Sequence, residues 1–232
     1  MLRPLLVACA VVALVPSLVL AMPTINCHCF RERTFDPAHP VAADDYFLAT
    51  SQNCFFAARF NVSKKKIVIK KQRGIAAEDL WVAYWLGEKS LQPGDILLGR
   101  KQAGESWNDI VSWLRLDEAV LGKGFVAGLQ GALTPDNADA FHLDQLIVDQ
   151  IIVDSVLLKG EELRRLRNKD ATNKMVILLV ALSYGKPGTA EQIYAEVTDI
   201  GRSWGELITQ YKLNVRQLPQ LFEQMFTSSK AS

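Results

Sequence analysis

The sequence predicts an all-α protein made of two similar helical units in tandem. Three observations support this: apolar residues recur at three- and four-residue spacing, alternating strand patterns hardly occur, and the phrase Gly-x-Ser-Trp appears twice. The two copies of the phrase begin at Gly104 and Gly201, a separation of 97 residues (201 − 104 = 97). Similar patterns upstream of each copy indicate that a whole unit is repeated.

The first residues predict export from the cell. Residues 1–21 carry one positive charge, at Arg3, and then an apolar run that closes on Val19, Leu20 and Ala21 in the manner of a signal-peptidase site. An uncleaved membrane anchor is the alternative, although the run is barely long enough to span a bilayer. We expect an exported protein, with no transmembrane segment after the signal peptide is removed.

Charge restricts the class of partner. Loss of Arg3 with the signal peptide leaves 25 basic residues (26 − 1 = 25) against 25 acidic ones, so the formal net charge of the mature chain is zero. A nucleic-acid-binding domain would need a clear basic excess, so nucleic acid is not an expected partner.

Helix caps and breakers give the order of the elements. A helix is expected from Asp44, a second after the N-cap Ser63 and ending at Gly74, a third ending at Gly87, and a fourth after Pro93. The stretch KKIVIKK has some strand character, but its caps favour a helix. The expected division is 1–21 signal peptide, 22–43 irregular N-terminal arm, 44–121 first helical unit, 122–140 linker, 141–221 second helical unit, and 222–232 C-terminal tail.

The offset between the units is expected to stay near 98, the distance from Gly87 to Gly185. A short unit of amphipathic helices buries its apolar faces poorly alone, and a second copy helps to cover them. The stretches LIVDQIIVDSVLL and MVILLVAL are apolar almost all round, which is typical of helices at the centre of a fold.

The repeated phrase has a structural explanation. Glycine ends one helix in a left-handed conformation, serine is the N-cap of the next, and an acid three residues later completes a capping box. Tryptophan at the first helical position can wedge between the two helices. These corner residues are Gly104, Ser106, Trp107 and Asp109 in the first copy, and Gly201, Ser203, Trp204 and Glu206 in the second.

The cysteines permit three interpretations. Cys27, His28 and Cys29 are adjacent, and Cys54 is the remaining cysteine of the mature chain. A disulfide from Cys27 or Cys29 to Cys54 is favoured in an oxidising compartment. A metal site formed by the two thiolates, the imidazole and Cys54 is an alternative, as are unpaired or redox-active thiols. The sequence implies no organic cofactor.

A basic run could contact an anionic partner, such as an envelope surface or an acidic protein. The interpretation that we favour is the solvated face of a helix, because the net charge is balanced. A weaker run of arginines follows in the second unit, around Arg164. The residues of the first run are Lys64, Lys65, Lys66, Lys70, Lys71 and Arg73.

Catalysis has little support in the sequence, because no nucleophile, base and orienting group are visible as a set. Export, duplication and balanced charge favour a non-enzymatic binding or structural protein of the bacterial envelope, with a protein or an anionic surface as partner. The alternative function is a metal-binding or thiol-redox protein that uses Cys27, His28, Cys29 and Cys54.

The phrases INCHCFRERTFDP, DDYFLATSQNCFFAARFNVSKK and the repeated G-x-S-W-x-[DE] together resemble a group of exported bacterial helical proteins of no assigned activity. The resemblance covers most of the mature chain and implies a bacterial envelope protein, periplasmic or secreted. It implies no catalytic residue. Asn108 in the first corner departs from the glycine, Gly205, of the second.

Overall fold

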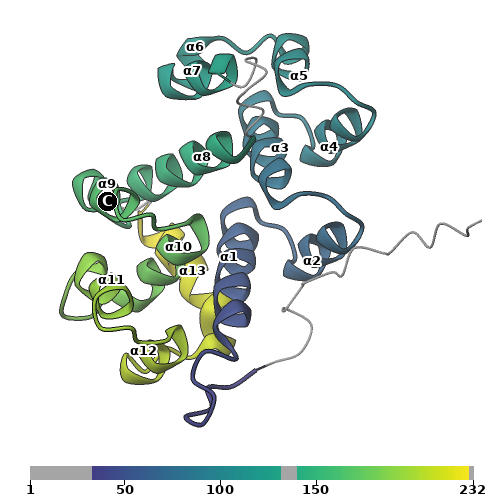
Figure 1. Cartoon of the computed structure of the whole chain (residues 1–232). Helices are drawn as coiled ribbons and strands as arrows, with labels where there is room; N and C mark the ends of the chain where they lie inside the picture. The colour runs from purple at the N-terminus through teal and green to yellow at the C-terminus, as the bar shows by residue number, and fades with distance from the viewer. Residues whose placement is uncertain (1–32, 132–139, 230–232) are drawn as a thin grey trace, which may run out of the picture.

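The computed structural model describes residues 33–131 and 140–229, and every regular element in these ranges is a helix (Figure 1). The all-α prediction is confirmed. The signal peptide and Cys27–Cys29 lie outside the described residues. The helices are α1 (Asp44–Phe60), α2 (Lys64–Gln72), α3 (Ala77–Ser90), α4 (Gly94–Gln102), α5 (Trp107–Leu114), α6 (Glu118–Leu121), α7 (Lys123–Gly131), α8 (Ala140–Asp154), α9 (Gly160–Arg167), α10 (Asn173–Ser183), α11 (Ala190–Thr198), α12 (Trp204–Gln210), the 3₁₀ helix η2 (Val215–Gln217) and α13 (Leu218–Ser229).

Five successive helices of the first half and five of the second begin at a nearly constant spacing. α8 starts 96 residues after α1 (140 − 44 = 96), and α9, α10 and α11 start 96 residues after α2, α3 and α4. α12 starts 97 residues after α5 (204 − 107 = 97). These spacings are close to the expected offset of 98, which was counted from Gly87, inside α3, to Gly185, beyond the end of α10.

Gly87 does not end its helix as expected, since α3 continues to Ser90. A Cβ at Gly87 would lie 2.6 Å from the carbonyl oxygen of Gln92. Residue 87 is glycine because the backbone of residues 92–94, which follows the helix, passes too close for a side chain.

The first part of the expected linker is also helical. Residues 123–131 form α7, whose apolar side chains Phe125 and Leu129 are buried. A Cβ at Gly128 would lie 2.9 Å from Cδ1 of Leu146 and 3.3 Å from Cδ2 of Leu143. Gly128 thus permits the close packing of α7 on α8. It is a packing glycine and not a flexible linker glycine as the sequence suggested.

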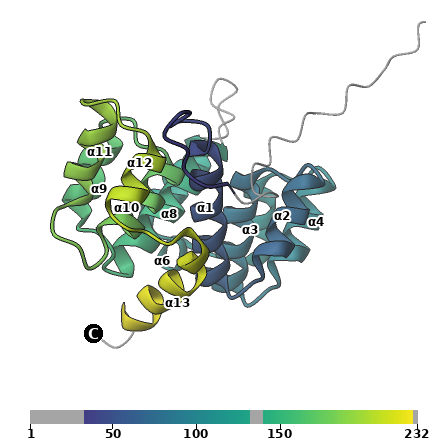
Figure 2. The ribbon, with the colours of Figure 1, turned by 90° about the horizontal axis from the view of Figure 1, so that it is seen from below.

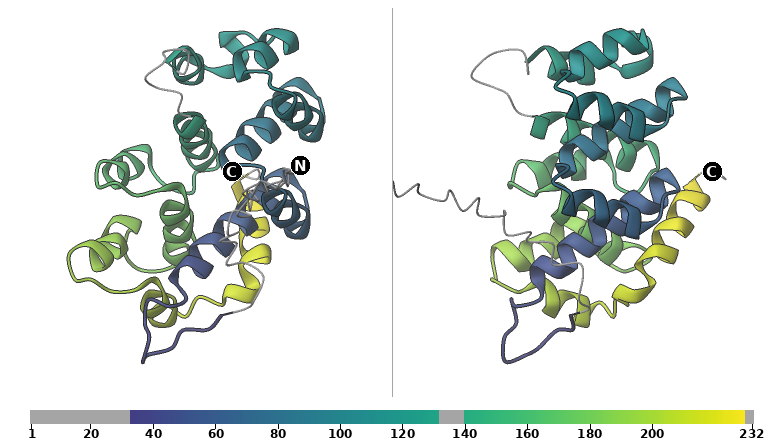
Figure 3. Two further views of the ribbon diagram at one scale, coloured as in Figure 1. Left: turned by 45° about the vertical axis from the view of Figure 1, so that its right-hand side comes forward. Right: turned by 90° about the vertical axis from the view of Figure 1, so that its right-hand side faces the viewer.

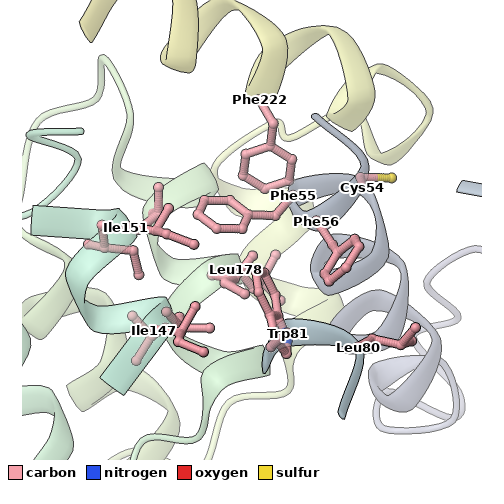
Figure 4. Close-up of a cluster of buried hydrophobic side chains, with 14 of the residues drawn as sticks. Cys54, Phe55, Phe56, Leu80, Trp81, Ile147, Ile151, Leu178 and Phe222 are labelled. Atoms are coloured by element: carbon pink, nitrogen blue, oxygen red, sulfur yellow. The ribbon is translucent and has the colours of Figure 1, made fainter. Parts of the chain in front are cut away.

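The expected tail belongs to the core, because residues 222–229 are part of α13. The ring of Phe222 meets that of Phe55 edge-on, with 5.2 Å between the centroids. Phe226 lies 5.1 Å from the same ring. Figure 4 shows Phe55 between Phe222 and the aliphatic side chains of the second half.

The two halves pack crosswise. α1 of the first half packs on α10 of the second, and α8 of the second half packs on α3 of the first. Figure 2 shows α2, α3 and α4 on one side of α1, and α9, α11 and α12 on the other. Further along the chain, α7 packs on α8 and α13 runs beside α1 (Figure 3).

The centre of the fold is α10, as its composition predicts. Its seven residues 176–182 are all buried, and they face helices from both halves. Burial of a medium-sized apolar side chain stabilises the fold by about 1.5–3 kcal/mol. α8 is buried along its apolar residues in the same way, but it also carries a buried carboxylate, Asp144.

Candidate functional site

Both Ser-Trp corners form capping boxes. In the first, the Ser106 hydroxyl accepts a hydrogen bond from the backbone N–H of Asp109 at 3.1 Å, and the Asp109 carboxylate accepts one from the N–H of Ser106 at 3.1 Å. In the second, Ser203 and Glu206 form the same pair of bonds at 3.1 and 2.7 Å. Each box satisfies two backbone donors that the start of a helix would otherwise leave unpaired.

The glycine and tryptophan of each corner are structural as well. Gly104 and Gly201 have φ angles of +97° and +81°, in the left-handed region. Trp107 and Trp204 are the first residues of α5 and α12, and both are buried. The indole N–H of Trp107 donates to Asp79 Oδ1 at 2.9 Å. The corners are therefore joints between helices.

The second corner is also attached to the N-terminal part of the chain. Asp44, the first residue of α1, accepts hydrogen bonds from the backbone N–H groups of the first two residues of α12, at 3.1 and 3.0 Å. Phe35 lies so close that a Cβ on Gly205 would be 2.6 Å from its Cδ2. Asn108, the counterpart of Gly205, instead donates to the carbonyl oxygen of Leu129 at 3.2 Å. The second corner has glycine because Phe35 packs on it, and the first has asparagine because its side chain binds the backbone of α7.

A groove of about 490 Å³ opens beside this junction, between the N-terminal arm, α1, α12 and η2. The arm and α1 contribute the rings of Phe35, Tyr46 and Phe47. The side chains of Ile208 and Leu213 contribute aliphatic surface from α12 and the turn that follows it. These side chains make one part of the lining apolar.

Two arginines give the groove its charge. Arg33 and Arg216 line it, and both are exposed. Arg33 Nη1 donates to the carbonyl oxygen of Ala42 at 3.0 Å, which holds the side chain against the arm. The side-chain oxygen of Asn214 accepts the backbone N–H of Arg216 at 3.1 Å and fixes the start of η2. A guanidinium group presents five donors in a geometry that matches carboxylates and phosphates.

Sequence reasoning did not select this groove. Arg33 and Phe35 lie in the irregular arm, where no period indicates which side chains share a face. Arg216 lies about 180 residues further on, and only the folded chain brings it to the same place. The charged and aromatic composition of residues 30–35 is the one signal that the sequence offers.

Cys54, on α1, is buried, and it is the one cysteine among residues 33–131 and 140–229, so no disulfide forms within these ranges. Burial raises the pKa of this thiol, and the Lys64 ammonium beside it offsets only part of that effect. A raised pKa disfavours the thiolate, which is the form that binds metals and attacks disulfides. Cys27, His28 and Cys29 lie outside the described residues, so the disulfide stays a prediction.

Three lysines of the first basic run bind side chains of neighbouring helices. Lys66 and Lys70 place their ammonium nitrogens 2.7 and 3.0 Å from the carboxylate of Asp95. Although burial raises the pKa of Asp95, hydrogen bonds from the two lysines and from a tyrosine lower it to about 2. Lys71 donates to Asn53 Oδ1 at 2.7 Å.

Basic residues of the second half also bind acidic side chains within the protein. Arg165 lies 2.7 Å from the carboxylate of Glu191, the counterpart of Asp95 at the spacing of 96 (191 − 95 = 96). Arg167 lies 2.5 Å from Asp149. Lys65 and Arg73 of the first run are exposed. The run as a whole is used mainly to join α2 to α1 and α4, which favours an intramolecular role over a docking surface.

A buried polar network joins α8 to α9 and α10. Asp144 Oδ2 accepts a hydrogen bond from the Asn173 amide at 2.6 Å, and Asn173 Oδ1 accepts one from Arg167 at 2.6 Å. Arg167 in turn pairs with Asp149. Burial and the nearby Glu78 raise the pKa of Asp144 to about 7, outweighing the opposite effects of Asn173 and Arg167. Asp144 therefore changes charge near neutral pH.

Within residues 33–131 and 140–229, no three His, Cys, Asp or Glu side chains are grouped as ligands for a metal ion. In the same residues no helix combines the length and apolar character needed to cross a membrane. Comparison of the chain with protein-family models, with curated proteins and with solved structures gives no match.

Proposed function

We propose that this chain is an exported, non-enzymatic binding protein of the bacterial envelope, and that its groove at the junction of the arm and α12 binds an amphipathic anion. The observation that carries the proposal is the combination of three rings with two exposed guanidinium groups around about 490 Å³. The apolar part of the lining would cover an aromatic or aliphatic body, and Arg33 and Arg216 would hold its carboxylate or phosphate. Export rests on the sequence of residues 1–21.

The arrangement of the groove supports binding more than catalysis. Its polar lining consists of guanidinium, hydroxyl and amide groups. The hydroxyls belong to Thr34, Thr209 and Tyr46. These groups can orient a ligand through hydrogen bonds, and this set holds no carboxylate, imidazole or thiol to act as a base beside them.

Isothermal titration of the mature chain with 4-phenylbutyrate, and with the neutral 4-phenyl-1-butanol, tests the proposal. We expect the carboxylate to bind at least tenfold more tightly than the alcohol. Arg33→Gln and Arg216→Gln should each weaken its binding about tenfold, because a hydrogen bond to a charged group contributes about 1.5–3 kcal/mol.

Arg73→Gln is the matched control, since Arg73 is an exposed arginine at the end of α2, outside the groove. It should leave the affinity unchanged. Equal binding of the acid and the alcohol would contradict the proposal, as would equal loss in all three variants.

We also infer that the two halves are copies of one ancestral helical unit. Five successive helices recur at a spacing of 96 or 97 residues, which supports this origin. The pairs Lys71–Asn53 and Arg167–Asp149 lie at the same spacing, and so do the acids Asp95 and Glu191. In an experimental structure, superposing residues 44–114 on 140–211 should align the helices in order. Ser-Trp corners at unrelated positions would disprove the inference.

A further inference from the structure

A second hollow, of about 280 Å³, adjoins the groove that Arg33 and Arg216 line. It lies between the turn after α10, the turn after α12, and the start of η2 and α13. Leu213 and Asn214 line both spaces, so the groove and the hollow meet at the turn between α12 and η2. Asn214 is exposed, and a ligand can therefore extend across it from one space into the other.

The charged side chains around the two spaces all have the same sign. Lys186 and Lys212 line the hollow, and both are exposed. Neither lysine forms an ion pair with another of the described residues. The described linings of the groove and the hollow contain no aspartate or glutamate. The chain has 26 basic and 25 acidic residues in all, so four cations together are a local excess of positive charge.

Neutral donors accompany the two lysines. The side-chain oxygen of Asn214 accepts the backbone N–H of Arg216, which leaves its amide nitrogen to donate hydrogen bonds. Gln217 and Tyr184 add an amide and a hydroxyl group to the same lining, and Leu221 adds aliphatic surface. The hollow can therefore bind an acidic group and cover a short apolar segment beside it.

The ends of α10 and α12 border the hollow, and the last carbonyl groups of a helix carry partial negative charge. These groups are already hydrogen-bonded. The carbonyl oxygen of Ser183, the last residue of α10, accepts the N–H of Lys186 at 3.1 Å. That of Thr209, in the last turn of α12, accepts the N–H of Lys212 at 3.1 Å. The full charges of the two ammonium groups outweigh what remains of these partial charges.

One carboxylate contacts a residue of the lining. Glu196 accepts a hydrogen bond from the hydroxyl group of Tyr211 at 2.8 Å. The same carboxylate lies 2.9 Å from the guanidinium group of Arg202. Its charge is thus balanced within the protein, and the lysines of the hollow keep their charge for a ligand.

We propose that the groove and the hollow together bind an elongated dianion, which carries an acidic group at each end of an apolar body. This inference rests on the proposed function, because the first acidic group is the one that Arg33 and Arg216 hold. The body passes over Leu213, and the second acidic group lies at Lys186 and Lys212. Hydrogen bonds between charged partners are about twice as strong as neutral ones, so the second group adds to the affinity.

Isothermal titration with pairs of probes of equal carbon number tests the inference: adipate against hexanoate, suberate against octanoate, and sebacate against decanoate. At least one dicarboxylate should bind about tenfold more tightly than its monocarboxylate, because it meets charged donors at both ends. Lys186→Gln and Lys212→Gln should each weaken the binding of that dicarboxylate about fivefold. Neither variant should change the binding of 4-phenylbutyrate, which occupies the groove alone.

Lys65→Gln is the matched control, since Lys65 is an exposed lysine of α2 outside both spaces. It should leave the affinity for every probe unchanged. Equal affinities within each pair of probes would overturn the inference, and so would equal effects of the three lysine variants.

A purely structural role of the lysines has a different signature. Lys186→Gln and Lys212→Gln would then lower the melting temperature and leave the ratio of the two affinities unchanged, which would also overturn the inference. If 4-phenylbutyrate still binds in any of these cases, the proposed function stands. Failure of every probe to bind would overturn both.

Discussion

Asp44 accepts a hydrogen bond from the backbone N–H of Gly205 at 3.0 Å, across 161 positions of sequence. The same carboxylate accepts the N–H of Trp204 at 3.1 Å. The first residue of α1 therefore caps α12, near the opposite end of the chain. This cap places the N-terminal arm against the second corner and so forms the groove that carries Arg33.

Asp44→Ala should lower the free energy of unfolding by about 1–2 kcal/mol, the usual loss when a helix N-cap is removed. Asp44→Asn keeps one acceptor oxygen and should lose about half as much. Urea denaturation followed by circular dichroism measures both variants. Equal stability of Asp44→Ala and the unmodified chain would mean that the cap contributes nothing.

Gly205→Ala should destabilise the protein by about 1–2 kcal/mol, because the new Cβ would lie 2.6 Å from Phe35. In a Phe35→Ala background the loss should be smaller, because the 2.6 Å approach is removed and only that to Phe47 Cε2, at 3.3 Å, remains, while alanine is favoured over glycine within a helix by about 1 kcal/mol. A double-mutant cycle from denaturation curves gives the coupling. Additive effects would show that the two residues do not meet in solution.

Asp144 should make stability depend on pH between about 4 and 7. Its folded pKa of about 7 lies above its ordinary value of 3.8, so in this window the native state binds a proton that the unfolded state has released. The contribution of Asp144 to the free energy of unfolding should therefore be greatest near pH 4. It should decrease as the pH rises to 7 and then level off.

Asp144→Asn resembles the protonated acid, so it should remove that decrease. At pH 8 the variant should be about 2 kcal/mol more stable than the unmodified chain, and near pH 4.5 the two should be similar. Denaturation midpoints at the two pH values provide the measurement, with exposed Glu118→Gln as the control. A constant difference at both pH values would contradict the assignment.

A chain that ends at residue 221 should not fold stably, because it lacks Phe222 and Phe226 of α13. Loss of one buried phenylalanine side chain alone costs about 3–5 kcal/mol, a large part of the stability of an ordinary domain. A chain that ends at residue 229 is the control and should melt like the full-length mature chain. A cooperative, unshifted melt of the shorter chain would show that α13 is dispensable.

The local parts of this structure could be predicted from the sequence. Ser106 with Asp109, and Ser203 with Glu206, encode their capping boxes within four residues, and the apolar run from Val176 to Leu182 encodes a buried helix. Such features depend on neighbours in sequence, which one sequence displays directly.

The groove and the role of α13 depend on distant partners, and the sequence alone could not supply them. Gly128 looks like a linker residue until the side chains of Leu143 and Leu146 are placed against it. Phe222 looks like part of a tail until Phe55 is found opposite. Lys70 looks like a free surface charge until Asp95 is brought beside it. In each case the deciding neighbour is set by tertiary packing.

The crosswise packing of the halves has a consequence for the order of assembly. α1 is buried by α10 and α13, so its apolar face is covered only when the last helix has been made. Closing so long a loop has an entropic cost that must be met before the contact forms, so these contacts form late. A chain that leaves the ribosome N-terminus first therefore completes the cover of α1 only after α13 has been synthesised, whereas neighbouring pairs such as α3 and α4 can pack earlier.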